Sequence, residues 1–272
     1  MKIAEYLKHL QSEYFQNRSD AIEFLSHISG IAYDRIPLSL SEEVDTSDAD
    51  ALLERFRNGE PLAYIINNKN FYGTDMYVDE NVLIPRPETE ILIDEVLKFA
   101  NGKENLRILD ICTGSGCILT TLLSHLPNST GIGVDISEGA LGVTAQNLHR
   151  QNLSDRAGLI CGDALRLGSI LTEKFDIITC NPPYLSETEW ESSDKSLKYE
   201  PKIALSAGDD DLLFYKKILD MIPELCNKSW CGAFFELGLG QYEKLIAEGY
   251  AAGWAVIRDY QQIERVVSWT NL

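Results

Sequence analysis

The sequence predicts an α/β fold: a mostly parallel sheet with helices on both faces, preceded by a small helical domain. From about residue 106 onward, short apolar segments alternate with longer segments of helical periodicity. Before about residue 70, apolar residues recur at helical spacing without such segments. An aromatic, β-prone stretch separates the two regions and indicates a hairpin between them.

The alternating region has the strand–helix–strand order of parallel sheets, in which the crossover helices cover the sheet faces. The expected strands cover residues 107–112, 131–135, 158–161, 175–180 and 233–237. The expected helices cover residues 115–125, 138–151 and 212–225. A terminal hairpin is expected from residues 255–258 and 265–269.

We expect the chain to form three parts. They are a helical domain at residues 1–70, a β-hairpin linker at 71–87 and a larger α/β domain at 88–272. In the linker, Asp79-Glu80-Asn81 is expected to form the turn before a strand at 82–84. Glu88 and Glu90 then place negative charge in the first turn of a helix that reaches about Ala100, which suits the helix dipole.

Composition and charge limit the class of protein. Hydrophobic residues make up 44% of the 272-residue chain and charged residues 24%, as in ordinary globular proteins. No apolar run approaches the roughly 20 residues that span a bilayer, and the first residues lack a signal-peptide pattern. We therefore expect a cytoplasmic protein without membrane contact.

The chain is strongly acidic, with a formal net charge of -18 and no cluster of Lys and Arg. Proteins that bind nucleic acid through phosphates usually have a basic face, so direct nucleic-acid binding is not expected. An acidic surface instead suits a basic protein partner or a cationic cofactor.

The cysteines are predicted to be buried free thiols rather than metal ligands or disulfides. No Cys-x-x-Cys pair occurs, and no histidine falls at metal-ligand spacing beside a cysteine, so no metal is expected. The cysteines are Cys112, Cys117, Cys161, Cys180, Cys226 and Cys231.

In an open parallel sheet, ligands bind at the carboxyl ends of the strands. The first expected strand runs into the turn Cys112-Thr113-Gly114-Ser115-Gly116. Its two glycines allow a tight turn and a close approach of the backbone to a ligand. The turn lacks the full pattern of a dinucleotide or P-loop site, so a purely structural strand-to-helix turn is the alternative.

Acidic residues follow the next two strands. Asp135 can accept hydrogen bonds from both hydroxyls of a ribose, although Asp135 or Ser137 could instead cap a helix. Asp163, followed by Ala164, could accept from an adenine amino group or cap a turn. Suitable groups at three successive strand ends favour a nucleoside ligand.

The fourth strand ends in Asn181-Pro182-Pro183-Tyr184, the most specific pattern in the chain. Proline has no N–H and a fixed φ, so this segment leaves the sheet with its carbonyls in set directions. The Asn181 side-chain oxygen and the Pro182 carbonyl can accept from one planar –NH₂ group, with Tyr184 as a flat face beside it. A rigid turn without chemistry is the alternative.

Together these residues resemble the HemK/PrmC family, which methylates the glutamine of the Gly-Gly-Gln motif in class I peptide chain release factors. The resemblance covers nearly the whole chain. It rests on residues 60–65, 71–73, 83–90, 181–184, 199–201, 204–205, 258–260 and 264–265. The segment Pro85-Arg86-Pro87-Glu88-Thr89-Glu90 is much more specific than Asn-Pro-Pro-Tyr, which nucleic-acid amino-methyltransferases share.

The resemblance implies a Rossmann-like, class I S-adenosylmethionine-dependent methyltransferase domain that releases S-adenosylhomocysteine. It implies that a release factor is the protein substrate, gripped in part by the helical domain, and we expect a monomer. The implied cofactor-binding residues are Cys112, Thr113, Gly114, Ser115, Gly116, Asp135, Asp163, Ala164 and Asn181. The implied catalytic and substrate-binding residues are Asn181, Pro182, Pro183 and Tyr184.

The chain departs from the family pattern at three positions. Cys112, Asn67 and Gln262 stand where many relatives have glycine. A Cβ at Cys112 is expected to be tolerated if φ there is negative. The other two departures are expected to alter loop shape only.

Three other functions remain open from the residues. A nucleic-acid amino-methyltransferase could hold a flipped base with the same four residues, and binding to RNA or DNA would distinguish it. A non-catalytic binding module could keep the fold alone and would fail to bind the cofactor. A nicotinamide-dependent oxidoreductase would need the third glycine that the turn lacks.

Overall fold

The computed structural model describes residues 1–271, and the chain divides into two compact units. The first unit comprises Met1–Asn68 and Lys195–Tyr199. The second comprises Lys69–Asp194 and the chain from Glu200 onward. Residues 195–199 therefore belong to the first unit although they lie far from it in sequence.

The first unit is helical. Its elements are α1 (Ile3–Glu13), α2 (Arg18–Ser29), η1 (Tyr33–Leu38), α3 (Ala49–Arg57), α4 (Leu62–Ile65) and η4 (Lys195–Tyr199). The apolar faces of the elements before residue 69 enclose a core in which the rings of Phe15 and Phe56 lie 4.6 Å apart. Gly30 ends α2 in a left-handed conformation with φ 68°, which glycine adopts without strain.

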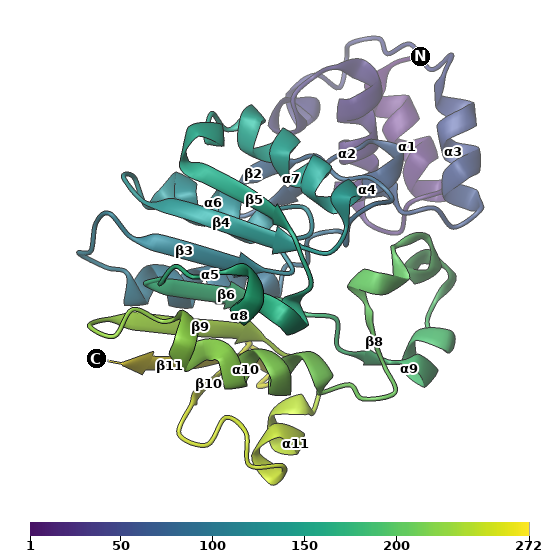
Figure 1. Cartoon of the computed structure of the whole chain (residues 1–272). Helices are drawn as coiled ribbons and strands as arrows, with labels where there is room; N and C mark the ends of the chain where they lie inside the picture. The colour runs from purple at the N-terminus through teal and green to yellow at the C-terminus, as the bar shows by residue number, and fades with distance from the viewer. Residues whose placement is uncertain (272) are drawn as a thin grey trace. The chain divides into compact units, whose positions relative to one another are not determined.

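The second unit is built on a seven-stranded sheet of order β10-β11-β9-β6-β3-β4-β5 (Figure 1). β11 runs antiparallel to both of its neighbours, β10 and β9, and the pairs formed by β9, β6, β3, β4 and β5 are parallel. The strands are β3 (Arg107–Ile111), β4 (Thr130–Asp135), β5 (Ala157–Cys161), β6 (Ile177–Cys180), β9 (Cys231–Glu236), β10 (Ala255–Arg258) and β11 (Glu264–Asn271). The predicted parallel core and terminal hairpin are confirmed.

Helices cover both faces of this sheet, and each face has its own apolar core. One face carries α5 (Thr89–Phe99), α6 (Cys117–His125) and α7 (Glu138–Arg150). The other carries α8 (Leu167–Ile170), α10 (Leu213–Leu225) and α11 (Gln241–Ala247). The remaining elements are η2 (Ser154–Arg156), η3 (Ala164–Arg166), β7 (Leu185–Ser186), α9 (Glu187–Glu191), η5 (Lys202–Ala204) and β8 (Ser206–Gly208).

No helix among residues 1–271 has the length and apolar character that crossing a membrane requires.

The hairpin ahead of the sheet forms earlier than predicted. β1 (Lys69–Phe71) pairs with β2 (Thr74–Met76), so the turn consists of Tyr72 and Gly73 and not of residues 79–81. Both turn residues have positive φ, 50° and 74°, as tight two-residue hairpin turns require. Residues 82–84 form no strand and instead lead toward the cavity described below.

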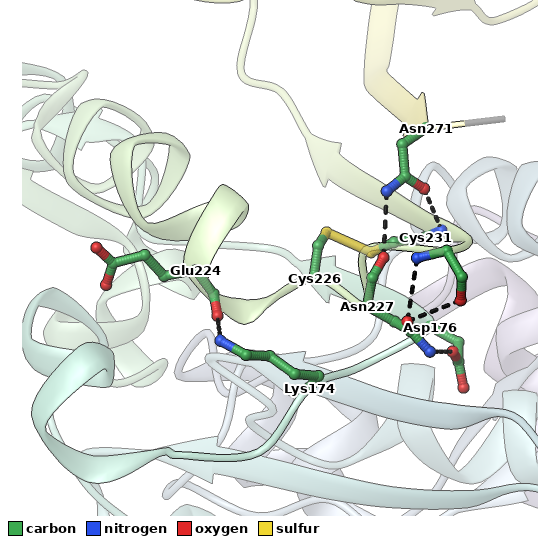
Figure 2. Close-up of a disulfide and its surroundings, with 8 residues drawn as sticks. Lys174, Asp176, Glu224, Cys226, Asn227, Cys231 and Asn271 are labelled. Carbon is green, nitrogen blue, oxygen red and sulfur yellow. Dashed lines mark hydrogen bonds between the residues drawn. A yellow bond between two sulfur atoms is a disulfide. The ribbon is translucent and has the colours of Figure 1, made fainter.

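The prediction that all cysteines are free is wrong for two of them. Cys226, directly after α10, and Cys231, the first residue of β9, form a disulfide (Figure 2). Asn227 and Asn271 brace the loop between them, since Asn227 donates to Asp176 at 2.9 Å and Asn271 donates to the Asn227 carbonyl at 3.1 Å. Two cysteines five positions apart match no common metal or redox spacing, so the sequence pattern does not reveal the pair.

We predict that reduction of this disulfide lowers the free energy of unfolding by about 2 kcal/mol, because the cross-link restricts the unfolded chain. The double variant Cys226→Ala/Cys231→Ala should lose the dependence on reductant. Chemical denaturation with and without reductant measures both effects. Cys161→Ala, which removes an exposed free thiol, is the control. Equal stability of the oxidised and reduced wild type would contradict the prediction.

Candidate active site

A cavity of about 260 Å³ lies at the carboxyl ends of β3, β4, β5 and β6. Its walls belong to the second unit alone. It brings together most of the predicted site residues, namely Cys112, Thr113, Gly114, Ser115, Asp135, Asp163, Ala164, Asn181 and Pro183. Gly116, Pro182 and Tyr184 are not among the lining residues.

The turn after β3 is held against β4. The Thr113 N–H donates to the Val134 carbonyl at 3.0 Å, and the Gly114 N–H donates to Asp135 Oδ2 at 2.9 Å. Gly116 precedes α6 with φ 73°, and a Cβ there would lie 2.5 Å from the Thr144 side chain. Gly116 therefore serves the packing of the turn against α7, and its predicted contact with cofactor stays a prediction.

Cys112 does not have the negative φ under which its Cβ was expected to be tolerated. Its φ is 58°, in the left-handed region that favours glycine. Asn67 and Gln262, the other departures from a family glycine, also have positive φ, at 50° and 63°. The backbone thus keeps the glycine conformation at all three positions, and the Cys112 side chain packs against the core, where its thiol interacts with that of Cys180.

Beneath the turn, Asp110 is a fully buried carboxylate in β3. Thr113 donates to its Oδ2 at 2.6 Å, and Thr179 of β6 donates to its Oδ1 at 2.7 Å. Burial raises the pKa of Asp110 to about 6, against the lowering effect of the two threonine hydroxyls. One side chain thereby joins the cofactor turn to the strand that leads to Asn181.

Asp135, the last residue of β4, retains capacity for a ligand. Oδ2 accepts from the Gly114 N–H and Oδ1 from the Ser137 N–H, each at 2.9 Å. A carboxylate oxygen has two acceptor sites, so each oxygen keeps one for a ligand hydroxyl. Burial raises the pKa of Asp135, while these N–H groups lower it. Ser137, not Asp135, caps α7.

Asp163 takes the capping role that the sequence left open, and its contact with adenine stays a prediction. Its Oδ1 accepts from the Leu165 N–H at 2.9 Å and so caps the short helix η3. Asp163 and Ala164 also line the cavity. The cap fixes the side chain at the mouth of β5 and leaves acceptor capacity on the carboxylate.

The segment 181–184 leaves the sheet directly after β6. Asn181 lines the cavity, and its side chain has no hydrogen-bond partner among residues 1–271. The Tyr184 carbonyl accepts from Gln241 Nε2 at 2.9 Å, and its N–H donates to the Leu205 carbonyl at 3.1 Å. The Tyr184 ring lies against Gly238, where a Cβ would come within 2.8 Å of it. Burial raises the pKa of Tyr184, so its phenol stays neutral.

An ion pair with a buried carboxylate connects two segments that line the cavity. Glu200, whose side chain is 3% exposed, pairs with Arg86 and also accepts from the Ile84 N–H at 3.0 Å. Arg86 is the only basic residue that lines the cavity within the described part of the chain. The pair joins residues 82–86 to the loop that carries Ile203 and Ala204, and both segments line the cavity.

The sequence patterns do not assign this wall to the site. Arg86 and Thr89 enter the sequence-based prediction only as part of a family signature, and residues 81–83 are predicted as a turn and strand. The sequence feature that could have revealed this wall is the presence of two family segments, Pro-Arg-Pro-Glu-Thr-Glu and Tyr-Glu-Pro. Arg86 of the first segment pairs with Glu200 of the second. The two paired residues are 114 positions apart in the sequence, so local patterns do not reveal the ion pair.

The residues present fit S-adenosylmethionine, which the resemblance implies. Asp135 offers two free acceptor positions for ribose hydroxyls, and Gly114 has no side chain to obstruct the approach. Asp163 can accept from an adenine amino group. Arg86 lines the cavity, and the guanidinium N–H groups that it does not use with Glu200 can donate to a carboxylate.

Comparisons with known proteins agree with this fold. A family model described as a methyltransferase domain matches residues 108–198. The crystal structure of the hMettl16 catalytic domain in complex with MAT2A 3′UTR hairpin 1 is 18% identical, with a TM-score of 0.54. That match covers 97% of this chain and 90% of the other, and it bears on the fold alone.

We predict that Asp135→Asn weakens binding of S-adenosylmethionine roughly 10- to 100-fold, because hydrogen bonds to a charged acceptor contribute about 1.5–3 kcal/mol. Titration calorimetry measures this affinity directly. Glu138→Gln is the matched control, since Glu138 is exposed in the first turn of α7. Unchanged affinity in Asp135→Asn would remove Asp135 from the cofactor site.

Curated relatives match along most of the chain. A release factor glutamine methyltransferase from Thermodesulfovibrio yellowstonii is 35% identical over 279 residues, which cover 98% of this chain and 97% of the relative. A bifunctional methyltransferase from Rickettsia typhi is 32% identical over 88% of this chain, which spans only 50% of that longer protein. The chain therefore belongs to the release factor glutamine methyltransferase family.

Proposed function

We propose that this protein transfers a methyl group from S-adenosylmethionine to the side-chain amide nitrogen, N5, of the glutamine in the Gly-Gly-Gln motif of a class I release factor. One observation carries the proposal most directly. The side chain of Asn181 lines the cavity without any partner among the described residues, directly after a strand that two prolines terminate. Family membership supports the choice of a glutamine amide.

When bound, S-adenosylmethionine supplies a methyl group on a positively charged sulfur. In this proposal Asp135 holds the ribose, Asp163 and Ala164 hold the adenine, and residues 112–116 form the floor beneath the cofactor. Arg86 remains paired with Glu200 and donates a further N–H to the carboxylate of the methionine part. No metal takes part, because methyl transfer from a sulfonium requires no Lewis acid.

An amide nitrogen is a weak nucleophile because its lone pair is delocalised into the carbonyl group. The Asn181 side-chain oxygen and the Pro182 carbonyl accept hydrogen bonds from the two N–H groups of this amide. These hydrogen bonds return electron density to the nitrogen and align it with the methyl carbon. The nitrogen becomes acidic only as it attacks, so its proton leaves late. A strong general base is therefore unnecessary.

The charge of the protein favours a protein substrate over nucleic acid. The formal net charge is -18, and Arg86 is the single basic residue of the cavity wall within residues 1–271. Phosphates would meet repulsion from such a surface. We expect the protein to act as a monomer in the cytoplasm, where release factors function.

We predict that purified release factor incubated with this protein and S-adenosylmethionine gains one methyl group on the glutamine of its Gly-Gly-Gln loop. Tandem mass spectrometry identifies the modified residue and atom together. The matched substrate control is release factor with that glutamine replaced by asparagine, which shortens the reach of the amide. Methylation of RNA or DNA, with none of release factor, would refute the proposal.

In the same assay, Asn181→Ala should lower the rate about 100-fold or more, as loss of a positioned transition-state acceptor does. Affinity for S-adenosylmethionine should stay within a few-fold, because Asp135 and the turn after β3 are unchanged. Calorimetry checks the binding, and near-native turnover would overturn the role assigned to Asn181.

A further inference from the structure

Glu236 carries a buried carboxylate oxygen without a hydrogen-bond partner. It is the last residue of β9 and is 3% exposed. The Thr89 hydroxyl at the start of α5 donates to the carboxylate, but Oε2 has no partner among the described residues. Buried polar atoms are nearly always paired, and Thr89, which donates to this carboxylate, lines the cavity. The unpaired Oε2 is therefore an acceptor that a group near the cavity can use.

The sheet register identifies the nearest neighbour of Glu236 on the next strand. β6 and β9 are parallel, and Cys180 pairs with Phe235. Glu236 is the next residue of β9, and Asn181 is the first residue after β6, so the two positions follow the last paired residues of adjacent strands. Side chains alternate along a strand, so Glu236 lies on the face of β9 that carries Phe234, the residue paired with Thr179 of β6.

Asn181 also lacks a partner, and its amide has two distinct ends. If the oxygen accepts from the substrate –NH₂, the Asn181 –NH₂ group points away from the substrate and needs an acceptor of its own. Without one, the amide could rotate and offer donors to the substrate, which has donors itself. The unpaired Oε2 of Glu236 is the buried acceptor on the adjacent strand.

We propose that Glu236 is a positioning residue whose carboxylate accepts from the Asn181 side-chain –NH₂ and so fixes the Asn181 oxygen toward the substrate amide. The inference rests on the proposed function. The same contact strengthens the Asn181 oxygen as an acceptor, because hydrogen bonds in a chain polarise one another.

The groups around Glu236 have opposing effects on the pKa of its carboxyl group. Burial raises the pKa of Glu236 to about 7, the Thr89 hydroxyl lowers it, Glu88 raises it, and Arg265 and Arg86 lower it. The titratable and charged groups that face it are Glu88 from the residue before α5, Arg86 from the preceding segment, Arg265 from β11, Tyr184 after β6, Cys180 from β6 and Cys117 from α6. Tyr215 of α10 donates to the Glu236 backbone carbonyl.

A charge-exchange cycle tests the contact. Glu236→Gln alone should lower kcat for release factor methylation about tenfold, as misplacement of a reacting group does. Asn181→Asp alone should lower it about 100-fold, because two carboxylates would meet. In the double variant the amide introduced at position 236 can donate to the carboxylate introduced at position 181, so kcat should exceed that of Asn181→Asp about tenfold. A double variant no more active than Asn181→Asp overturns the proposal, since independent effects would multiply.

Wild-type protein provides a measurement that does not depend on variants. Above the pKa of about 7 the ionised Glu236 holds Asn181, so kcat should fall as pH decreases through this value. The side-chain amide signals of Asn181 in ¹H–¹⁵N spectra should shift with the same midpoint. If the chemical shifts of the Asn181 side-chain amide, measured relative to a reference amide, do not change across that pH, the proposed contact between Glu236 and Asn181 is overturned.

The matched control is Asp176→Asn, the same carboxylate-to-amide change at the opposite end of the sheet, where Asp176 accepts from the Arg107 N–H and from Asn227. It should alter stability but neither kcat nor its pH profile.

The assay separates the two proposals. An inactive wild type would refute the proposed function, whereas an active wild type with unaltered kcat in Glu236→Gln would refute only the role of Glu236.

Discussion

The buried carboxylate of Asp110 is the interaction on which the site depends. It accepts from Thr113 in the turn after β3 and from Thr179 two residues before Asn181. Both bonds lie in a water-free interior, where paired polar groups interact strongly and fix one arrangement. The cofactor turn and the strand that delivers Asn181 therefore keep a constant relation, which alignment of two reacting atoms requires.

The opposite wall of the cavity depends on a second buried carboxylate. Glu200 joins residues 82–86 to the loop around Ile203 through Arg86 and the Ile84 N–H. A buried ion pair is weak evidence for stability, because removing two charges from water offsets much of their attraction. Its value here is positional, since it fixes the separation of two loops that regular secondary structure does not hold.

Much of the fold and half of the site could be read from the sequence because they depend on local patterns. Periodicity located the strands, and the strand-end rule selected Asp135, Asp163 and Asn181, which line one cavity. The true hairpin turn was missed because Tyr72 takes a positive φ that its side chain does not suggest. Cys112 shows the same limitation, since its backbone conformation is imposed by the turn and not by its residue type.

The features that the sequence concealed are contacts between distant segments. The Cys226–Cys231 disulfide depends on how α10 meets β9, and the Arg86–Glu200 pair depends on chain closure over 114 positions. That Glu236 has an unpaired oxygen, and which strand lies next to it, can be known only from the structure. Hydrophobic patterning predicts which face of a strand is buried, but it does not identify the neighbour of a polar side chain on that face.

The end of β6 also explains why substrate choice must rest on other residues. Two oxygens that accept from one planar –NH₂ group suit a glutamine amide and a base amine equally well. Discrimination therefore falls to the walls around that point, and these are the loops joined by Arg86 and Glu200. Within residues 1–271 that wall carries one basic residue, Arg86, and the protein is strongly acidic, so the wall suits a peptide loop better than a phosphate backbone. Under the proposed function, the segment 181–184 would supply the chemistry, and the loops joined by Arg86 and Glu200 would select the amine that reaches it.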